Sequence, residues 1–427
     1  TKQIYIGLLD RVIAFCDQYG YTYKFQDNKF YGLPYEENEN ISPQGVGDWV
    51  KSITSYKPRD YQLHGIYTAL RSNRKLIVSP TASGKSLMIY ALVAYYAQRN
   101  ENILIVVPTT SLVEQMYKDF EDYGFDVGSY CHKIYGGKEL QTDKQVTITT
   151  WQSIYKLPKP FFQKYSVVIG DEAHNFKSKS LVNIMTKLCD AKYRFGFTGT
   201  LDGSKTHKWV LEGLFGSCEQ VTKTDDLIKS GYLSKFRIKV LLCKHAPEHF
   251  ESYHDEMDYL VEHRGRNNLI KNLVKDLDGN TLVLFNYIEK HGEPLYELIN
   301  NTIDPERKLF FVHGGTDVED REAVRQITES ENDAVILASY GTFSTGINIK
   351  RLHNIIFASP SKSRIRNLQS IGRVLRKGEG KDIATLYDIA DDIGGQNYTL
   401  KHLNERVTIY NEENFKYEVI KVNLRAG

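Results

Sequence analysis

The stretch that decides the fold is Ser166-Val167-Val168-Ile169-Gly170-Asp171-Glu172-Ala173-His174. Its first half is an unbroken apolar run, which is typical of a strand buried on both faces of a parallel sheet. Two adjacent carboxylates follow at the strand's carboxyl end, where they suit a metal ion and a water molecule better than a hydrophobic core. A solvated surface turn would explain these four final residues by themselves. The interpretation therefore depends on whether the rest of a nucleotide site occurs elsewhere in the chain.

A phosphate-binding segment lies upstream, in the order that the chemistry requires. A short apolar strand over residues 75–78 precedes Ser79-Pro80-Thr81-Ala82-Ser83-Gly84-Lys85-Ser86, and an amphipathic helix is predicted over residues 87–98. Strand, loop and helix in this order are typical of a P-loop. The segment has Ser79 where the full pattern has its first glycine. The second half of the pattern is intact.

The residue types in this segment predict an ATP and Mg²⁺ site. The loop members of the site are Pro80, Thr81, Ala82, Ser83 and Gly84. Backbone N–H groups of the loop and of the helix start are expected to surround the phosphates, and Lys85 to contact the β- and γ-phosphates. The Ser86 hydroxyl is expected to bind Mg²⁺, with Asp171 holding the same ion through water. Glu172 is then the candidate that orients or deprotonates the attacking water.

Composition sets broad bounds. The 427 residues allow two or three domains, and Lys+Arg 55 against Asp+Glu 53 leave a net charge of +2, so any nucleic-acid surface must be local. The five cysteines are scattered without a C-x-x-C pair, which favours a reducing cytoplasm over a zinc site or a disulfide framework. No run approaches the roughly 18 apolar residues of a membrane span, so no membrane partner is expected. The chain starts with Thr1 rather than Met, which indicates a fragment or a processed chain.

Two α/β halves are predicted after a small N-terminal module. Residues 1–52 are expected to form an α+β accessory module, with a helix over 8–19, a strand over 21–25 and DNA binding as a candidate role. Strands alternate with helices over residues 53–228 and again over 229–427, which predicts two doubly wound parallel sheets. The predicted strands are residues 76–78, 103–107, 146–149, 167–169, 194–198, 237–243, 281–285, 308–312, 334–338, 354–357 and 383–388.

A basic segment near residue 370 carries two arginines. In Gln369-Ser370-Ile371-Gly372-Arg373-Val374-Leu375-Arg376 the spacing of Arg373 and Arg376 is expected to place both on one helical face. An arginine supplied to a γ-phosphate stabilises transition-state charge and is worth roughly 10³-fold or more in rate. Since the second half has no phosphate loop of its own, these arginines make most sense across a cleft from the first half. A solvated basic helix face is the alternative, because Lys377 and Lys381 follow.

Two shorter segments have two interpretations each. Thr198-Gly199-Thr200 closes a predicted strand, either as a plain turn or as a relay that senses the nucleotide state from beside Asp171 and His174. Arg59 and Gln62 lie at a predicted helix start upstream of the phosphate loop. An amide there could recognise the edge of adenine, and an ordinary surface helix N-terminus explains the same residues.

Taken together, these segments resemble the ordered motifs of superfamily-two helicases over residues 55–395. The matching segments are the Gln62 region (motif Q), residues 80–86 (I), 107–110 (Ia), 149–153 (Ic), 171–174 (II), 198–200 (III), 338–348 (V) and 369–376 (VI). Residues 105–110, 338–348 and 371–377 resemble, in particular, phage recombination helicases of the UvsW type. The N-terminal module is shorter here than the resemblance to that type implies, which puts a duplex-binding role for it in doubt.

The resemblance implies two tandem RecA-like lobes that use ATP and Mg²⁺. It also implies that Gly346 and Asn348 contact the nucleotide, and that His174, Thr198, Thr200 and Gln369 couple the nucleotide state to movement. The nucleic-acid contacts that it implies are Thr109, Thr110, Thr150, Trp151, Gln152, His313, Gly314, Thr342 and Ser344, with packing as the favoured alternative for Trp151.

The activity implied is ATP-dependent branch migration of forked or Holliday-junction DNA, by a monomer in the cytoplasm of an infected bacterium. A helicase acting on RNA or RNA–DNA hybrids would use the same lobes. A restriction-enzyme motor is another alternative, although no nuclease carboxylate-and-lysine motif is found. A non-catalytic nucleic-acid clamp would bind without ATP turnover. The intact set Lys85, Asp171, Glu172, Arg373 and Arg376 argues against the clamp.

Overall fold

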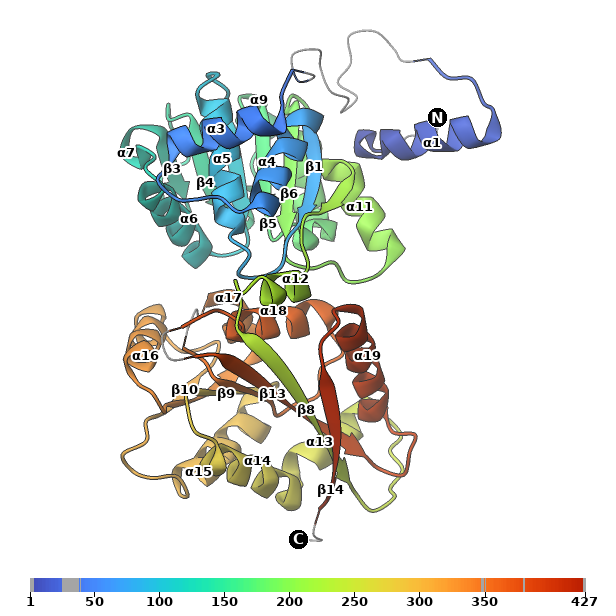
Figure 1. Ribbon diagram of the computed structural model, residues 1–427, viewed down its shortest axis with the longest axis vertical. Coiled ribbons are helices and arrows are strands. Elements are labelled where there is room, and N and C mark those ends of the chain that lie inside the picture. The colour runs from blue at the N-terminus through green and yellow to red at the C-terminus, as the bar shows by residue number, and fades with distance from the viewer. Residues whose placement is uncertain are drawn as a thin grey trace. The chain divides into compact units, whose positions relative to one another are not determined.

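The computed structural model describes residues 4–24, 38, 40–346, 349, 351–378 and 381–424. The chain divides into two compact units, Thr1–Thr222 and Lys223–Gly427, each with a seven-stranded sheet (Figure 1). We call them lobe 1 and lobe 2. The division follows Thr222, whereas the sequence predicted it after residue 228. None of the described helices has the length and apolar character that crossing a membrane requires.

The sheet of lobe 1 is parallel throughout its described strands, as the apolar runs predicted. Its strands, in spatial order, are β3 (Cys131–Ile134), β4 (Val146–Thr150), β2 (Ile103–Val107), β5 (Val167–Asp171), β6 (Tyr193–Thr198), β1 (Arg74–Val78) and β7 (Cys218–Gln220). The five predicted strands are confirmed. The edge strands β3 and β7 are additional, since neither has a long apolar run.

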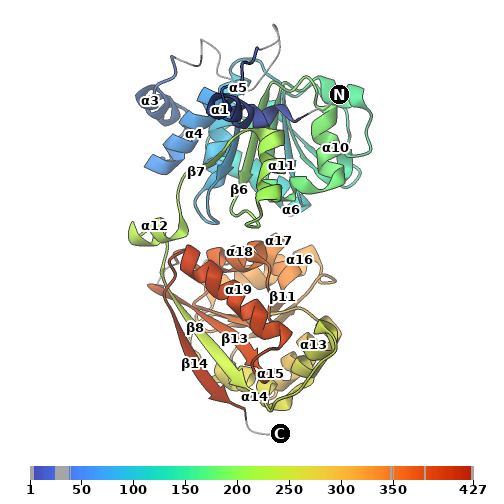
Figure 2. The same cartoon turned by 90° about the vertical axis from the view of Figure 1, so that its right-hand side faces the viewer.

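Helices cover both faces of this sheet (Figure 2). One face packs against α3 (Pro43–Ile53), α4 (Asp60–Ser72), α5 (Lys85–Ala97), α6 (Thr110–Asp122) and α7 (Val127–Tyr130). The other packs against α8 (Trp151–Ile154), α9 (Lys159–Gln163), η2 (Ala173–Lys177), α10 (Lys179–Lys187) and α11 (Lys205–Phe215). All seven strands run the same way, so their carboxyl ends share one edge, where the predicted site residues follow β1, β2, β4, β5 and β6.

Helix α5 differs from its prediction in one respect. It was expected to be amphipathic, but nearly all of its residues, including Leu87, Ile89 and Tyr96, are buried. The helix lies between the sheet and neighbouring helices α3, α4 and α6, which leave it no broad solvent face. The amphipathic prediction was therefore wrong, because tertiary packing covers the outward side.

Lobe 2, like lobe 1, is built on a parallel sheet. Its strands, in spatial order, are β10 (Leu309–Val312), β11 (Val335–Ser339), β9 (Thr281–Phe285), β12 (Asn354–Phe357), β13 (Ile383–Asp392), β8 (Lys235–Lys244) and β14 (Tyr417–Asn423). Its helices are α12 (Thr224–Lys229), α13 (Tyr253–Glu262), α14 (Arg264–Asp276), the π-helix η3 (Ile288–Gly292), α15 (Glu293–Asn300), α16 (Val318–Ser330), α17 (Tyr340–Gly346), α18 (Arg364–Val374) and α19 (Tyr398–Glu412). The six predicted strands are confirmed, and the predicted fold class of two parallel α/β lobes is correct.

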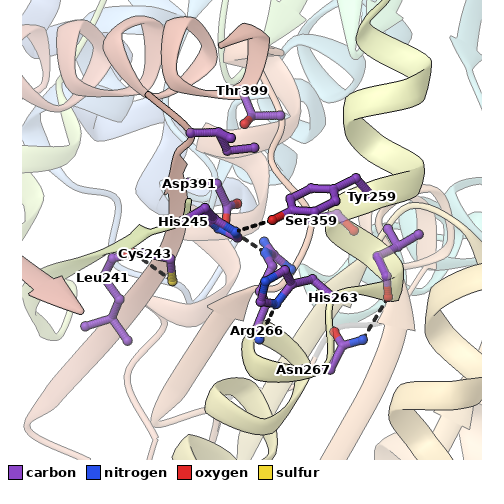
Figure 3. Close-up of polar contacts among 12 residues, drawn as sticks. Leu241, Cys243, His245, Tyr259, His263, Arg266, Asn267, Ser359, Asp391 and Thr399 are labelled. Atoms are coloured by element: carbon purple, nitrogen blue, oxygen red, sulfur yellow. Dashed lines mark hydrogen bonds and ion pairs between the residues drawn. The ribbon is translucent and has the colours of Figure 1, made fainter. Parts of the chain in front are cut away.

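A buried ionic network joins the carboxyl ends of β8 and β13 to helix α14 (Figure 3). The fully buried Asp391 accepts hydrogen bonds from Arg266 Nε and His245 Nε2, both at 2.9 Å. Burial raises the pKa of Asp391, but Arg266 and His245 outweigh that effect and hold the pKa at about 2. The carboxylate is therefore charged inside the core and depends on its partners.

The described part of the N-terminal segment is helical from Ile6 to Tyr19. The predicted helix is confirmed as η1 (Ile6–Leu8) and α1 (Leu9–Tyr19), and Arg11 of α1 pairs with Glu212 of α11 at 2.7 Å. The predicted strand over 21–25 is wrong for residues 21–24, which form no strand, and its last residue lies outside the described residues. Tyr21 and Tyr23 are exposed, and residues 21–24 belong to neither of the described sheets.

Candidate active site

The phosphate loop turns from β1 directly into α5. Gly84 has φ 78° and is the N-cap of α5, whose first two residues are Lys85 and Ser86. Lys85 Nζ donates to the carbonyl of Ser79 at 3.4 Å, and Ser79 Oγ donates to Ser83 Oγ at 2.7 Å. Ser79 therefore closes the loop with its hydroxyl at the position where the usual pattern has glycine.

Ala82 holds the loop in a conformation that favours glycine. Its φ is 66°, in the left-handed region where a Cβ is disfavoured. We expect Ala82→Gly to stabilise lobe 1 by about 0.5–1 kcal/mol, because relief of this strain exceeds the added unfolded-state entropy. Thermal unfolding followed by tryptophan fluorescence checks this. Ala91→Gly inside α5 is the matched control and should destabilise by about 1 kcal/mol or more. A lower midpoint for Ala82→Gly would contradict the strain argument.

Tyr61 and Gln62 of α4 bind the phosphate loop, and Arg59 contacts both of them. The predicted helix start is confirmed, with Arg59 as the N-cap of α4. The buried Gln62 amide donates to the carbonyls of Ser83 at 2.9 Å and Gly84 at 3.2 Å, and its oxygen accepts from Arg59 N at 2.8 Å. The Tyr61 hydroxyl also donates to the Ser83 carbonyl, at 2.6 Å. In this structure Gln62 fixes the loop, and recognition of adenine by its edge stays a prediction.

The two carboxylates follow β5 at the same edge of the sheet. Glu172 has φ 50°, a strained conformation for a residue with a side chain, and its N–H donates to Asp171 Oδ1 at 2.9 Å. Burial and the neighbouring Glu172 carboxylate raise the pKa of Asp171 to about 7, while the Lys85 ammonium lowers it. A pair of close carboxylates incompletely neutralised by lysine fits a divalent cation. Ser86 and Asp171 supply the oxygen ligands that Mg²⁺ prefers.

His174 links this turn to the strand end at Thr198. His174 Nδ1 lies 3.0 Å from Thr198 Oγ1 and 3.3 Å from Glu172 Oε2, and Thr198 Oγ1 donates to the Thr200 carbonyl at 3.0 Å. Burial lowers the pKa of His174 more than Glu172 raises it, which favours the neutral ring. The structure thus brings together His174, Thr198 and Thr200. Between the two threonines, a Cβ on Gly199 would lie 3.3 Å from Thr81 Oγ1 and 3.6 Å from Lys85 Nζ, so this glycine faces the phosphate loop.

A residue that sequence reasoning missed supports this turn from α11. The buried His207 has Nε2 2.9 Å from the His174 carbonyl and Nδ1 2.8 Å from Asp202 Oδ1. Asp202 also pairs with Lys177 at 3.1 Å. The only signal in the sequence is a histidine shortly after Thr-Gly-Thr, which is too common to identify such a role.

The predicted nucleic-acid residues of lobe 1 follow β2 and β4. Thr109 is the N-cap of α6, where its hydroxyl accepts from Leu112 N, and Thr110 begins the helix. Gln152 Nε2 donates to the Pro108 carbonyl at 3.1 Å, which joins the two segments. Thr150 Oγ1 lies 2.8 Å from Ser153 Oγ. Trp151 packs on Tyr155 with ring centroids 5.7 Å apart and against the hydrophobic core, as the packing alternative predicted.

Lobe 2 places its predicted contacts at the ends of β10 and β11. His313 N donates to Thr316 Oγ1 at 3.0 Å, and the carbonyl of the exposed Gly314 accepts from Arg321 at 2.9 Å. The buried Thr342 of α17 has Oγ1 2.8 Å from Oγ of Ser339, the last residue of β11. Ser344 and Gly346 belong to α17, but their surroundings, and all of Asn348, lie outside the described residues.

The basic segment of lobe 2 differs from its prediction in two respects. Gln369 and Arg373 lie in α18, with the Arg373 guanidinium 5.4 Å from the centre of the Phe343 ring, but α18 ends at Val374 and Arg376 follows it. The two arginines therefore do not share one helical face. Lys381, which was considered part of a solvated basic face, is buried and donates to the carbonyls of Val374 and Arg376. Burial, together with Arg376, lowers the pKa of Lys381 to about 7. Lys381 therefore satisfies the carbonyl of the last residue of α18 and one carbonyl beyond the helix.

Comparison with known proteins agrees with this geometry. Residues 55–203 match the family described as "Type III restriction enzyme, res subunit", and residues 265–378 match "Helicase conserved C-terminal domain". The chain is 32% identical to the ATP-dependent DNA helicase uvsW of Enterobacteria phage T4, over 98% of this chain and 88% of that protein. The chain belongs to the superfamily-two helicases, in the UvsW family.

Other relatives of this helicase are more distant. It is 26% identical to the DNA 3'-5' translocase XPB2 of Sulfurisphaera tokodaii, over 83% of this chain and 87% of that protein. A fragment of a putative HsdR subunit of a type I restriction enzyme from Vibrio vulnificus has a TM-score of 0.68 at 18% identity, covering 91% of this chain and 72% of that one. At that identity the likeness shows a shared fold alone.

Proposed function

We propose that this helicase is an ATP-dependent DNA motor that moves forks and junctions by branch migration. The observation that carries the proposal is the meeting of Lys85, Asp171 and Glu172 at one edge of lobe 1, in a chain related to a DNA helicase. Action as a monomer, in the cytoplasm of an infected bacterium, is part of the proposal. The relationship with uvsW, an ATP-dependent DNA helicase, favours DNA over RNA or RNA–DNA hybrids as the substrate.

Each site residue has one task in this proposal. Backbone groups at the start of α5 and the Lys85 ammonium bind the phosphates of ATP. Ser86 and Asp171 hold Mg²⁺, which neutralises charge on the phosphate oxygens when bound. Glu172 orients the attacking water and takes up its proton. Arg373 and Arg376 stabilise charge on the γ-phosphate from lobe 2.

Movement depends on transmitting the nucleotide state away from this edge. His174 touches both Glu172 and Thr198, so a change at the water-binding carboxylate alters the strand end at Thr198–Thr200. In lobe 1 the hydroxyl and amide groups at Thr109, Thr110, Thr150 and Gln152 are of the type that contacts phosphates without sequence preference. Alternating grip on one strand, driven by closure and opening of the lobes, would move the enzyme along DNA.

A substrate panel tests the proposal. We expect the wild type to displace strands from labelled forks and Holliday junctions only with ATP, and Lys85→Ala to lose this movement by roughly 10²-fold or more. Lys118→Ala, an exposed lysine on α6, is the matched control and should behave like wild type. Gel assays on forks, junctions, plain duplexes and RNA–DNA hybrids give the readout.

Two results would count against it. Binding to junctions without ATP-dependent strand movement would contradict the motor and favour a clamp. Strong preference for RNA–DNA hybrids over junctions would contradict branch migration, although the motor assignment would survive.

A further inference from the structure

A tyrosine outside the helicase motifs touches the proposed Mg²⁺ ligand. Ser86 is the second residue of α5, and its Oγ lies 2.8 Å from the Tyr123 hydroxyl oxygen. Tyr123 caps the carboxyl end of α6, where its N–H donates to the Asp119 carbonyl at 2.9 Å. The contact therefore ties the start of the helix that follows the phosphate loop to the end of a different helix.

Packing fixes the position of the Tyr123 ring. The ring meets Tyr56 edge-on, with centroids 5.0 Å apart and an interplanar angle of 85°, and it leans on Tyr90 at 5.3 Å. Tyr90 is itself held, since its hydroxyl donates to the Ile53 carbonyl at 2.7 Å. Packing against Tyr56 and Tyr90 therefore fixes the position of the Tyr123 hydroxyl beside Ser86. The residues that hold it belong to α3, α5, α6 and the segment after α3, and none of them is part of the phosphate loop.

The contact between Ser86 and Tyr123 can orient the Ser86 hydroxyl as a metal ligand. A serine that offers a lone pair to a cation must direct its O–H hydrogen elsewhere, and an acceptor behind the ligand fixes its orientation. We infer that Tyr123 is a positioning residue that accepts the Ser86 hydrogen and so presents the Ser86 lone pair to Mg²⁺. This inference rests on the proposed ATP and Mg²⁺ site, and it adds a residue that none of the motifs contains.

Tyr123→Phe removes the acceptor and keeps the ring. We expect it to raise the Mg²⁺ concentration needed for half-maximal binding of ADP about five-fold, the effect of losing one neutral hydrogen bond. Binding of ADP without Mg²⁺ should stay unchanged, because the Tyr123 hydroxyl acts only through Ser86. The readout is the fluorescence of a labelled ADP on the full chain, titrated with Mg²⁺, so ATP turnover is not needed.

Two comparisons separate positioning from a general packing effect. Tyr90→Phe alters the same aromatic cluster and also loses a hydrogen bond, but that bond goes to the Ile53 carbonyl and not to the Ser86 hydroxyl, so the Mg²⁺ titration should stay unchanged. In the Ser86→Ala background, Tyr123→Phe should have no further effect, since the group that it positions is gone.

Three outcomes would overturn the inference. They are a titration of Tyr123→Phe within two-fold of wild type, the same shift in Tyr90→Phe, and additive effects of Ser86→Ala and Tyr123→Phe. Failure of the wild type to bind ADP more tightly with Mg²⁺ would instead overturn the proposed site itself. The two failures are therefore distinguishable in one set of titrations.

Discussion

Glu172→Gln is expected to lower ATP turnover by roughly 10²–10⁴-fold while leaving nucleotide binding intact, the range that general-base catalysis contributes. The amide keeps the shape of the side chain, and the strained backbone at φ 50° is unchanged. The amide side chain, however, cannot take up a proton from the attacking water. Since Glu172 also raises the pKa of Asp171, the neutral amide should make Asp171 easier to ionise, so binding of Mg²⁺ should not weaken.

The measurement is steady-state phosphate release with saturating DNA, beside equilibrium binding of labelled ADP with Mg²⁺. Glu121→Gln, an exposed glutamate on α6, is the matched control and should retain wild-type turnover. Turnover above about half of the wild-type rate in Glu172→Gln would remove Glu172 from the chemistry. Loss of nucleotide binding would assign it to the binding of the metal instead.

Arg266→Ala is expected to destabilise lobe 2 by about 3–5 kcal/mol, because it leaves the Asp391 carboxylate buried without its guanidinium partner. Asp391 and Arg266 are both fully buried, and the variant leaves the carboxylate with the hydrogen bond from His245 Nε2 (Figure 3). Arg264→Ala removes an exposed arginine from the same helix and should cost no more than about 0.5 kcal/mol.

The positions of the tryptophans make it possible to measure whether Arg266→Ala destabilises lobe 2 alone. The chain has 3 tryptophans, Trp49, Trp151 and Trp209, all in lobe 1. Tryptophan fluorescence should therefore report an unchanged midpoint in denaturant, while far-UV circular dichroism shows a separate, earlier transition for lobe 2. A double variant, Arg266→Met with Asp391→Leu, should recover part of the loss, because no orphan charge remains. No early transition in Arg266→Ala would show that the pair contributes little.

Every interior strand of the two sheets was predicted from the sequence, together with the edge strand β10. β2, β9 and β12 have the predicted bounds, because strands covered on both faces carry apolar residues at nearly every position. The missed strands β3, β7 and β14 are edges or short, and β14 is largely exposed. Their pairing depends on a neighbouring strand that lies far away in the sequence, which no local pattern reveals.

Helix limits and helix faces were less predictable. The basic segment has helical spacing through Arg376, but α18 ends at Val374, and the buried Lys381 donates to the carbonyls of Val374 and Arg376 there. A lysine after a basic helix gives no sign of burial, since its charge favours solvent unless carbonyls surround it. Similarly, α5 has few polar residues because α3, α4 and α6 cover it. That covering depends on how the helices of lobe 1 pack, which the sequence of α5 alone does not reveal.

By itself, the sequence determined the order of the motifs and the chemistry at each strand end, since buried strands and the phosphate loop have strong local patterns. Asp171 and Glu172 could be proposed as site residues from those local patterns. Only the tertiary structure decided what surrounds them: the loop held by Gln62, the turn supported by His207 and the Ser86 hydroxyl beside Tyr123. Those partners come from distant helices, and a single buried hydrogen bond leaves no periodic trace in a sequence.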